Sequence, residues 1–510
     1  MASTANRIIK NTGWLYAKMA VTMFVSLYTT RLVLGSLGAS DFGIYNIVGG
    51  AIAMLGFLNS SMAGASQRFM SYTEGEGNRE KLKSIFNISL VLHTAISLIA
   101  VVAFAAAGYF FFSGILNIPA DRLHAAVVIY GSMVVSTAFT IMSVPYEAVM
   151  NAHENMRYFA FVGIFESALK LAVAFATVYA AADKLIVYGL LMAVIPFVTL
   201  TFMRIYCHRH YAECIIAPRR YFDRRLAREM TGFAGWNMLS SVTAIGTQYG
   251  LGIVLNHFFG TLLNAAQGIA NQLCGMLLAF SNNMLKAINP VIAKSEGSGN
   301  REKMIDVTLL SCKYSYLIFA VFVIPTMVDT EYILKLWLND VPLWAVLFLK
   351  LQLIRSLFDQ LIISINTAIN AQGTIGRVSI YRSIYYVAPI ILTYIGFSYG
   401  YEAYWLYIFW ISCWCIVGGI VALYFCHKQC SLSYKRYFHV VILPVTICTA
   451  VSYFSGKIIT SFMSEGLLRL AIVAAITIMM LLCSYWFFGT DKREKGVLKS
   501  LYTTLINIKP

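Results

Sequence analysis

Long apolar stretches separated by short polar segments run along the whole chain. Each stretch holds about 20 residues, the length that an α-helix needs to cross the hydrocarbon core of a bilayer. The pattern predicts fourteen such helices, at residues 12–34, 42–63, 84–112, 125–149, 158–181, 185–204, 233–256, 262–285, 306–328, 342–369, 378–397, 402–425, 437–456 and 467–489. We therefore expect an all-α polytopic membrane protein with about 14 transmembrane helices.

The composition agrees with this pattern and excludes several classes of protein. Of the 510 residues, 59% are hydrophobic and 12% are charged, whereas soluble domains are about half apolar and about a quarter charged. No loop of the type GxxxxGK[ST], which cradles a nucleotide phosphate, occurs in the sequence. We therefore expect no sizeable soluble domain, no ATP hydrolysis and no cofactor.

The basic residues predict the orientation of the chain. If the N-terminus is cytoplasmic, the segments on that side hold 27 of the 39 Lys and Arg residues and the opposite loops hold 5. Short loops rich in Lys and Arg stay in the cytoplasm, so the bias predicts cytoplasmic N- and C-termini. Because topology explains most of the formal charge of +16, we expect no nucleic-acid partner.

A polar phrase occurs twice in the chain. Residues 74–82 (EGEGNREKL) and 296–304 (EGSGNREKM) share seven of nine positions at a separation of 222, and the same offset aligns Gly38 with Gly260. Six predicted helices separate the two copies, so both should face the cytoplasm. The repeat predicts a duplicated six-helix unit.

This duplication defines the expected domain organisation. We expect two pseudo-symmetric six-helix lobes at residues 1–230 and 231–435, followed by two C-terminal helices and a basic cytoplasmic tail at residues 436–510. Transporters with parallel repeats bind substrate between the two halves, near the middle of the membrane.

The repeated phrase also has a local interpretation. Its glycines allow a tight turn, and Asn78 and Asn300 are expected to cap the following helices. Its charged residues have two open interpretations. They form an ordinary cytoplasmic turn, or they pair across the lobes when the cytoplasmic side closes; the residues in question are Glu74, Arg79, Glu296 and Arg301.

Several motifs in this order resemble a known family. ASQRF (65–69), the EGxGNREK turn, LKLWL (334–338), NAQG (370–373) and two extra terminal helices are similar to the polysaccharide flippases of the multidrug/oligosaccharidyl-lipid/polysaccharide exporter superfamily. The resemblance implies a bacterial inner-membrane protein that translocates undecaprenyl-diphosphate-linked oligosaccharide to the periplasmic leaflet by alternating access. It implies a role in O-antigen or capsule synthesis, with membrane lipids and polysaccharide polymerase machinery as partners. The driving force stays open among protons, sodium ions and membrane potential.

Charged and amide side chains inside the predicted helices indicate where a substrate would bind. Basic residues outnumber acidic ones by four within the predicted helices, which suits an anionic ligand. Arg31 points away from Lys18, and Glu147 and Arg382 lie near predicted helix ends, where long side chains reach the interface. Polar stripes on helical faces give the candidate cavity residues, which are Lys18, Glu166, Lys170, Asn264, Gln267, Asn271, Gln352, Arg355, Asp359 and Asn366.

Other interpretations of these residues stay open. Each polar side chain could instead form a hydrogen bond between helices. A drug or cation exporter of the multidrug and toxin extrusion type would need acidic residues in its cavity, and residues 12–34 contain none. A membrane enzyme would need catalytic residues on a substantial loop, so we expect no catalytic site. The segment CHRHYAEC (207–214) lacks the ligand spacing of a zinc site, so we expect no metal.

Overall fold

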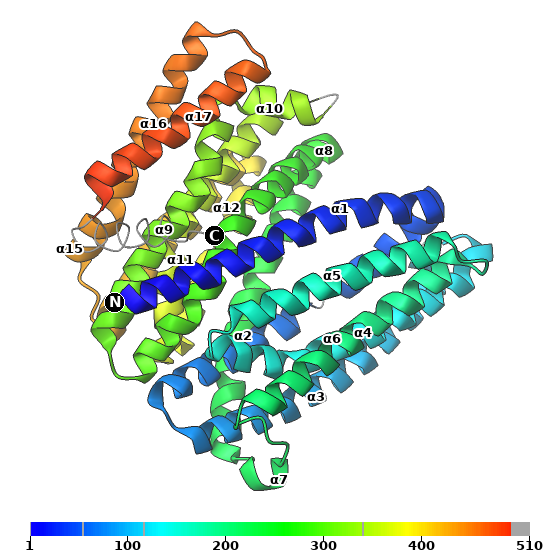
Figure 1. Ribbon diagram of the computed structural model, residues 1–510. Helices are drawn as coiled ribbons and strands as arrows, with labels where there is room; N and C mark the ends of the chain where they lie inside the picture. Colours follow the sequence, from blue (N-terminus) through cyan, green and yellow to red (C-terminus); the bar gives the residue numbers. More distant parts are fainter. Residues whose placement is uncertain (1, 54–55, 116–117, 339–340, 491–510) are drawn as a thin grey trace, which may run out of the picture. The chain divides into compact units, whose positions relative to one another are not determined.

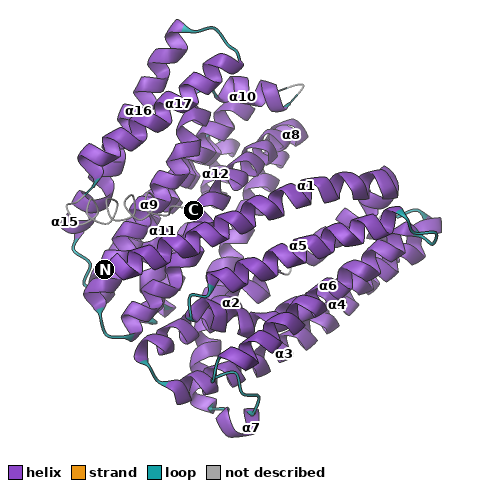
Figure 2. Cartoon of the chain, viewed as in Figure 1, coloured by secondary structure: helices purple, strands orange, loops and turns teal. Residues whose placement is uncertain are grey.

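The computed structural model describes residues 2–53, 56–115, 118–338 and 341–490. Every regular element in these ranges is a helix (Figures 1 and 2). The chain divides into two compact units, Asn11–Met238 and Leu239–Pro510 with Met1–Lys10. The division into residues 1–230, 231–435 and 436–510 stays a prediction, and the basic tail beyond residue 490 lies outside the described residues.

The first unit consists of long helices joined by short turns. Its elements are α1 (Ala2–Ala53), α2 (Gly56–Glu76), α3 (Arg79–Phe110), the π-helical segment η1 (Phe111–Ile115), the 3-10 turn η2 (Ala120–Arg122), α4 (Leu123–Ala152), α5 (Met156–Val178), α6 (Lys184–His210) and α7 (Pro218–Tyr221). Helix α4 packs against α2, α3 and α6, and α5 packs against α6. Phe104, Ile129 and Leu185 lie in the resulting core.

The second unit begins within a very long helix. Its elements are α8 (Arg224–Gly297), α9 (Arg301–Val328), α10 (Thr330–Trp337), α11 (Ala345–Gln372), α12 (Gly376–Ser398), α13 (Trp405–Trp410), η3 (Ile411–Val417), α14 (Gly418–Cys430), α15 (Tyr434–Tyr437), η4 (Phe438–Ile442), α16 (Leu443–Phe462), α17 (Leu467–Ser484) and η5 (Tyr485–Gly489). Helix α9 packs against α11, α16 and α17. Phe319, Phe348 and Tyr407 are fully enclosed in this core.

Two glycines divide the longest helices. Gly38 interrupts α1 with φ 77° and ψ 169°, and Gly260 interrupts α8 with φ 77° and ψ −172°. Counted with these divisions, and with each π-helical segment joined to its neighbours, the described residues contain fifteen helical segments of 15 residues or more, and two of these, residues 39–53 and 56–76, lie on either side of residues 54–55. Eleven segments of the described chain are long and apolar enough to cross a membrane. These features confirm the expected polytopic, all-α fold.

The two copies of the repeated phrase adopt the same local structure. Gly77 has φ 71° and Gly299 has φ 74°, so both turns need a left-handed residue. The side-chain oxygen of Asn78 accepts a hydrogen bond from the Lys81 backbone N–H, and Asn300 caps the helix at Lys303 in the same way, each at 3.0 Å. The predicted N-caps are therefore confirmed.

Candidate functional site

Charged side chains from three helices of the first unit gather around Lys18 of α1. A side-chain carbon at Gly163 of α5 would overlap the Lys18 methylene groups. The bare glycine therefore lets this side chain lie against α5, where its ammonium group is 4.4 Å from the centre of the Phe159 ring. A cation over an aromatic face is favourable when partly desolvated.

Two carboxylates accompany this lysine. Glu166 and Lys170 form an ion pair of 2.6 Å along α5, with side chains 38% and 42% exposed. Lys18 lies within electrostatic range of this pair and of Glu147 on α4. The three predicted residues are therefore brought together, and Glu147 joins them. Because α4 continues to Ala152, Glu147 lies inside the helix, where it accepts a hydrogen bond of 3.2 Å from Ser143.

The amide residues of α8 lie just beyond its glycine kink. The side-chain oxygens of Asn264 and Gln267 would each be 3.4 Å from a carbon added at Gly252, so both face the preceding half of α8. Gln267 is 3% exposed. Within the described residues, its Nε2 and the Oδ1 of Asn271 have no hydrogen-bond partner. Such amide groups can bind hydroxyl groups.

Arg355 is enclosed within the second unit. Its Nη1 is 2.6 Å from Asp359 Oδ2, and its Nε donates to Gln352 Oε1 at 3.3 Å. The guanidinium group lies 4.4 Å from the Trp410 ring centre, and the residue is 8% exposed. This geometry is that of a held structural pair on α11, and a substrate role for Arg355 stays a prediction.

Asn366 has a partner that the sequence did not indicate. Arg382 of α12 donates to Asn366 Oδ1 of α11 at 2.7 Å. The expectation that Arg382 extends to the interface is wrong, because the residue is 7% exposed. Arg382 is the seventh residue of α12, which begins at Gly376, and its side chain is held against α11 by the bond to Asn366.

The charged residues of the repeated turns have partners in their own units. In the first unit, Glu74 lies 3.5 Å from His153, and His153 bonds Glu213. Burial alone would raise the pKa of Glu213, but the His153 hydrogen bond and backbone contacts hold this pKa below its ordinary value. Arg79 is exposed and acts on Glu213 at longer range.

In the second unit, Glu296 pairs with Arg301. Arg301 also donates to the Gln429 carbonyl oxygen at 2.6 Å, so it links the turn to the end of α14. Pairing of the turn residues across the lobes stays a prediction. Within the described residues, no group of three His, Cys, Asp or Glu side chains could hold a metal ion.

Comparison with solved structures shows that this arrangement of helices has been observed before. An outward-facing multidrug resistance MATE family transporter of the MOP superfamily is 14% identical, with a TM-score of 0.71 over 84% of this chain and 96% of that one. The fold is MATE-like. A MATE in the bent conformation is 13% identical, with a TM-score of 0.71 over 88% and 97% of the two chains.

A third similar structure is a MOP superfamily transporter from Pyrococcus furiosus. It is 13% identical, with a TM-score of 0.70 over 84% of this chain and 97% of that one, and is described as having a binding pocket of reverse polarity that suggests a different function. No protein-family profile matches the sequence. No curated protein sequence matches it either. The MATE-like similarity therefore concerns the fold.

Proposed function

We propose that the protein is a secondary transporter that exports an amphiphilic substrate by alternating access of its two lobes. One observation carries this proposal: the described helices share the MATE-like arrangement over 84% of the chain, with TM-scores of 0.71 and 0.70 to two transporters of the MOP superfamily. The internal repeat at offset 222 supports it, because duplicated lobes are the usual basis of alternating access.

The structural comparisons favour a MATE-type exporter as the first substrate class. The similar structures include a multidrug resistance transporter, whereas the flippase assignment rests on sequence motifs alone. The first unit also supplies Glu147 and Glu166 beside Lys18. Carboxylates next to lysines can exchange a proton or a sodium ion for the ammonium partner, which would couple export to an ion gradient.

The charge inside the helices keeps the lipid-linked oligosaccharide flippase as a second candidate. Basic residues outnumber acidic ones by four within the predicted helices, and such an excess suits a diphosphate better than a cationic drug. The Nε2 of Gln267 and the Oδ1 of Asn271, which have no hydrogen-bond partner among the described residues, suit sugar hydroxyls. On this proposal the protein lies in the bacterial inner membrane with both termini cytoplasmic, and supplies the polysaccharide polymerase machinery.

Purified protein in proteoliposomes distinguishes the two substrate classes. A MATE-type exporter should move a cationic dye when a proton or sodium gradient is applied, and Glu166→Gln should abolish this movement. The matched change Asp121→Asn, at an exposed position of the 3-10 turn η2, should leave it unchanged. A flippase should instead move undecaprenyl-diphosphate-linked sugar between leaflets, and Lys18→Gln should slow it more than Arg209→Gln does. Movement of neither substrate class would refute the proposed transport activity.

Cells provide an independent test. In a host with this gene as its single flippase, deletion should leave lipid-linked oligosaccharide on the cytoplasmic leaflet and reduce surface polysaccharide if the second candidate is right. Normal surface glycan together with reduced efflux of cationic dye would identify the exporter.

A further inference from the structure

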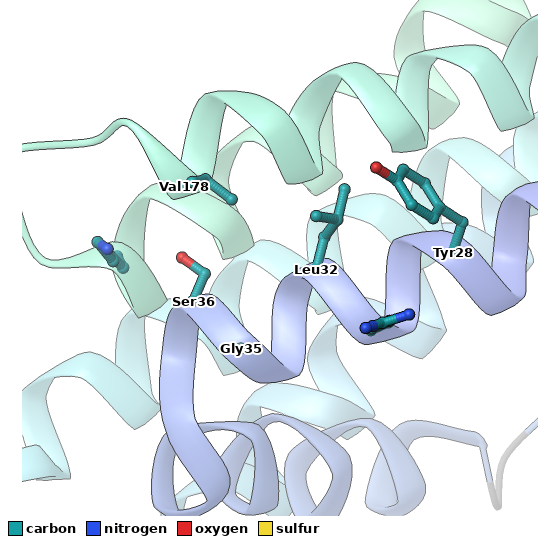
Figure 3. Close-up of a pocket in the computed structure, with 7 residues that line it drawn as sticks. Tyr28, Leu32, Gly35, Ser36 and Val178 are labelled. Carbon is teal, nitrogen blue, oxygen red and sulfur yellow. The ribbon is translucent and has the colours of Figure 1, made fainter.

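A pocket opens on the first unit, where the first half of α1 approaches the end of α5 and the start of α6. Its volume is about 580 Å³. In Figure 3, Tyr28, Leu32 and Ser36 follow one another along α1, and Val178 lies on the neighbouring helix. The pocket is lined by Tyr28, Arg31, Leu32, Gly35, Ser36, Val178 and Lys184, none of which belongs to the candidate cavity described above.

The pocket carries two positive charges that lack acidic partners within the described residues. Neither Arg31 nor Lys184 forms an ion pair there, although two carboxylates lie at the same end of the unit. Both carboxylates are bound to Arg122, whose Nη1 is 2.6 Å from Asp183 Oδ2 and whose Nε is 2.8 Å from Asp41 Oδ1. Because Arg122 occupies the acids, the charges in the pocket are available to an anion.

The pocket also has an apolar wall. Leu32 and Val178 line it beside the two cations, so it offers an apolar surface and a cationic surface together. Ser36 donates a hydrogen bond of 3.4 Å to the Thr177 carbonyl oxygen, which holds α1 against α5 at this point. A small inorganic anion would leave the apolar wall unused, whereas an amphiphile would contact both surfaces.

The pocket lies near the ends of the helical segments that line it. Tyr179, which follows α5 directly, is 84% exposed, and exposed aromatic residues mark the headgroup level. Lys184 is the first residue of α6. Arg31 lies seven residues before the kink at Gly38, which corresponds to about 10 Å along the helix axis. Long Lys and Arg side chains near the ends of membrane-spanning helices extend toward the headgroup level, so this position suits a lipid phosphate.

We propose that Arg31 and Lys184 bind the phosphate group of an anionic lipid at this end of the first unit. The guanidinium group can donate two parallel hydrogen bonds to phosphate oxygens, and the lysine contributes a mobile point charge. The Tyr28 hydroxyl supplies a further donor at the rim. This site is separate from the Lys18 cluster, and binding to it does not depend on the proposed transport activity.

Native mass spectrometry of the full-length protein in detergent tests the site. Phosphatidylglycerol and phosphatidylcholine with the same acyl chains are the probes, and inorganic phosphate is the competitor. The wild type should prefer phosphatidylglycerol, and the double change Arg31→Gln with Lys184→Gln should weaken that binding at least tenfold. The matched double change Arg209→Gln with Arg219→Gln removes two exposed cations elsewhere in the unit and should alter it less than twofold.

Further measurements separate charge, folding and ligand source. Arg31→Lys with Lys184→Arg keeps both charges and should retain binding. If the neutral double variant unfolds early in a thermal melt, the single Lys184→Gln variant should still lose at least threefold in affinity. Equal binding of the two lipids by the wild type, or unchanged binding by the neutral variants, would overturn the proposal. Inorganic phosphate that binds as tightly as phosphatidylglycerol would overturn the assignment to a lipid.

Discussion

Replacing Gly260 with alanine should destabilise the second unit through backbone conformation alone. Gly260 has φ 77° and ψ −172°, a region that residues with a side chain rarely enter, at a cost of about 1–3 kcal/mol. No atom lies within 4 Å of the position that its Cβ would occupy, so no clash adds to this strain. We therefore expect Gly260→Ala to lower the free energy of unfolding by about 1–3 kcal/mol.

Gly268 provides the matched control. It lies in the same α8 with helical backbone, and the position of its added Cβ is equally open. Alanine there should raise stability by about 0.5–1 kcal/mol, because it restricts the unfolded chain and suits a helix. The two glycine-to-alanine variants should therefore differ by roughly 1.5–4 kcal/mol, the sum of these opposite effects.

Equilibrium unfolding in mixed detergent micelles measures this difference. Gly38→Ala should resemble Gly260→Ala within about 0.5 kcal/mol, because Gly38 has φ 77° and ψ 169° and its added Cβ also meets no atom. Gly260→Ala as stable as Gly268→Ala would refute the reasoning, since it would mean that the kink adopts another conformation.

Three further predictions follow from individual contacts. Arg355→Gln should lower the free energy of unfolding by about 3–5 kcal/mol, because it leaves Asp359 buried without its partner, and the abundance of the protein should fall with it. Adding Asp359→Asn should restore both, whereas wild-type stability of the single variant would contradict the structural pair. The hydrogen bonds from Arg122 hold the pKa of Asp183 below its ordinary value. The contribution of Asp183 to the free energy of unfolding is therefore complete above the unfolded pKa and is lost as the pH falls through the folded pKa, below about 4. Asp183→Asn should remove that part of the acid dependence in thermal melts. Cysteines at Glu76 and Ser298, which are equivalent and exposed, should react with an impermeant thiol reagent in inside-out vesicles but not in intact cells, where labelling would refute the topology.

Features that depend on local backbone chemistry could be predicted from the sequence. The equivalence of Gly38 and Gly260, the caps at Asn78 and Asn300, and the number of long helices all follow from short segments. The ion pair between Glu166 and Lys170 could also be predicted, because residues spaced by four positions lie on the same face of a helix. These features need no knowledge of what packs against the helix.

The environment of Glu147 and Arg382 could not be predicted in this way. The predicted bounds differ from those of α4 and α12 by only one to three residues, so the error concerns the packing around the two side chains and not the helix ends. Periodicity gives the direction of a side chain around its own axis, but it does not identify the helix that covers it. Arg355 illustrates this limit, because its contact with Trp410 joins segments far apart in the chain.

The two repeated turns differ in which of their features are shared between the halves of the chain. Both copies keep glycine and asparagine where the backbone requires a left-handed residue and a cap. The contacts of the preceding glutamate differ between the copies: Glu296 pairs with Arg301 of its own turn, and Glu74 lies beside His153 of its own unit. The two turns thus share their backbone conformation and helix caps but differ in their ionic contacts. A substitution of the charged residues can therefore affect one half without affecting the other.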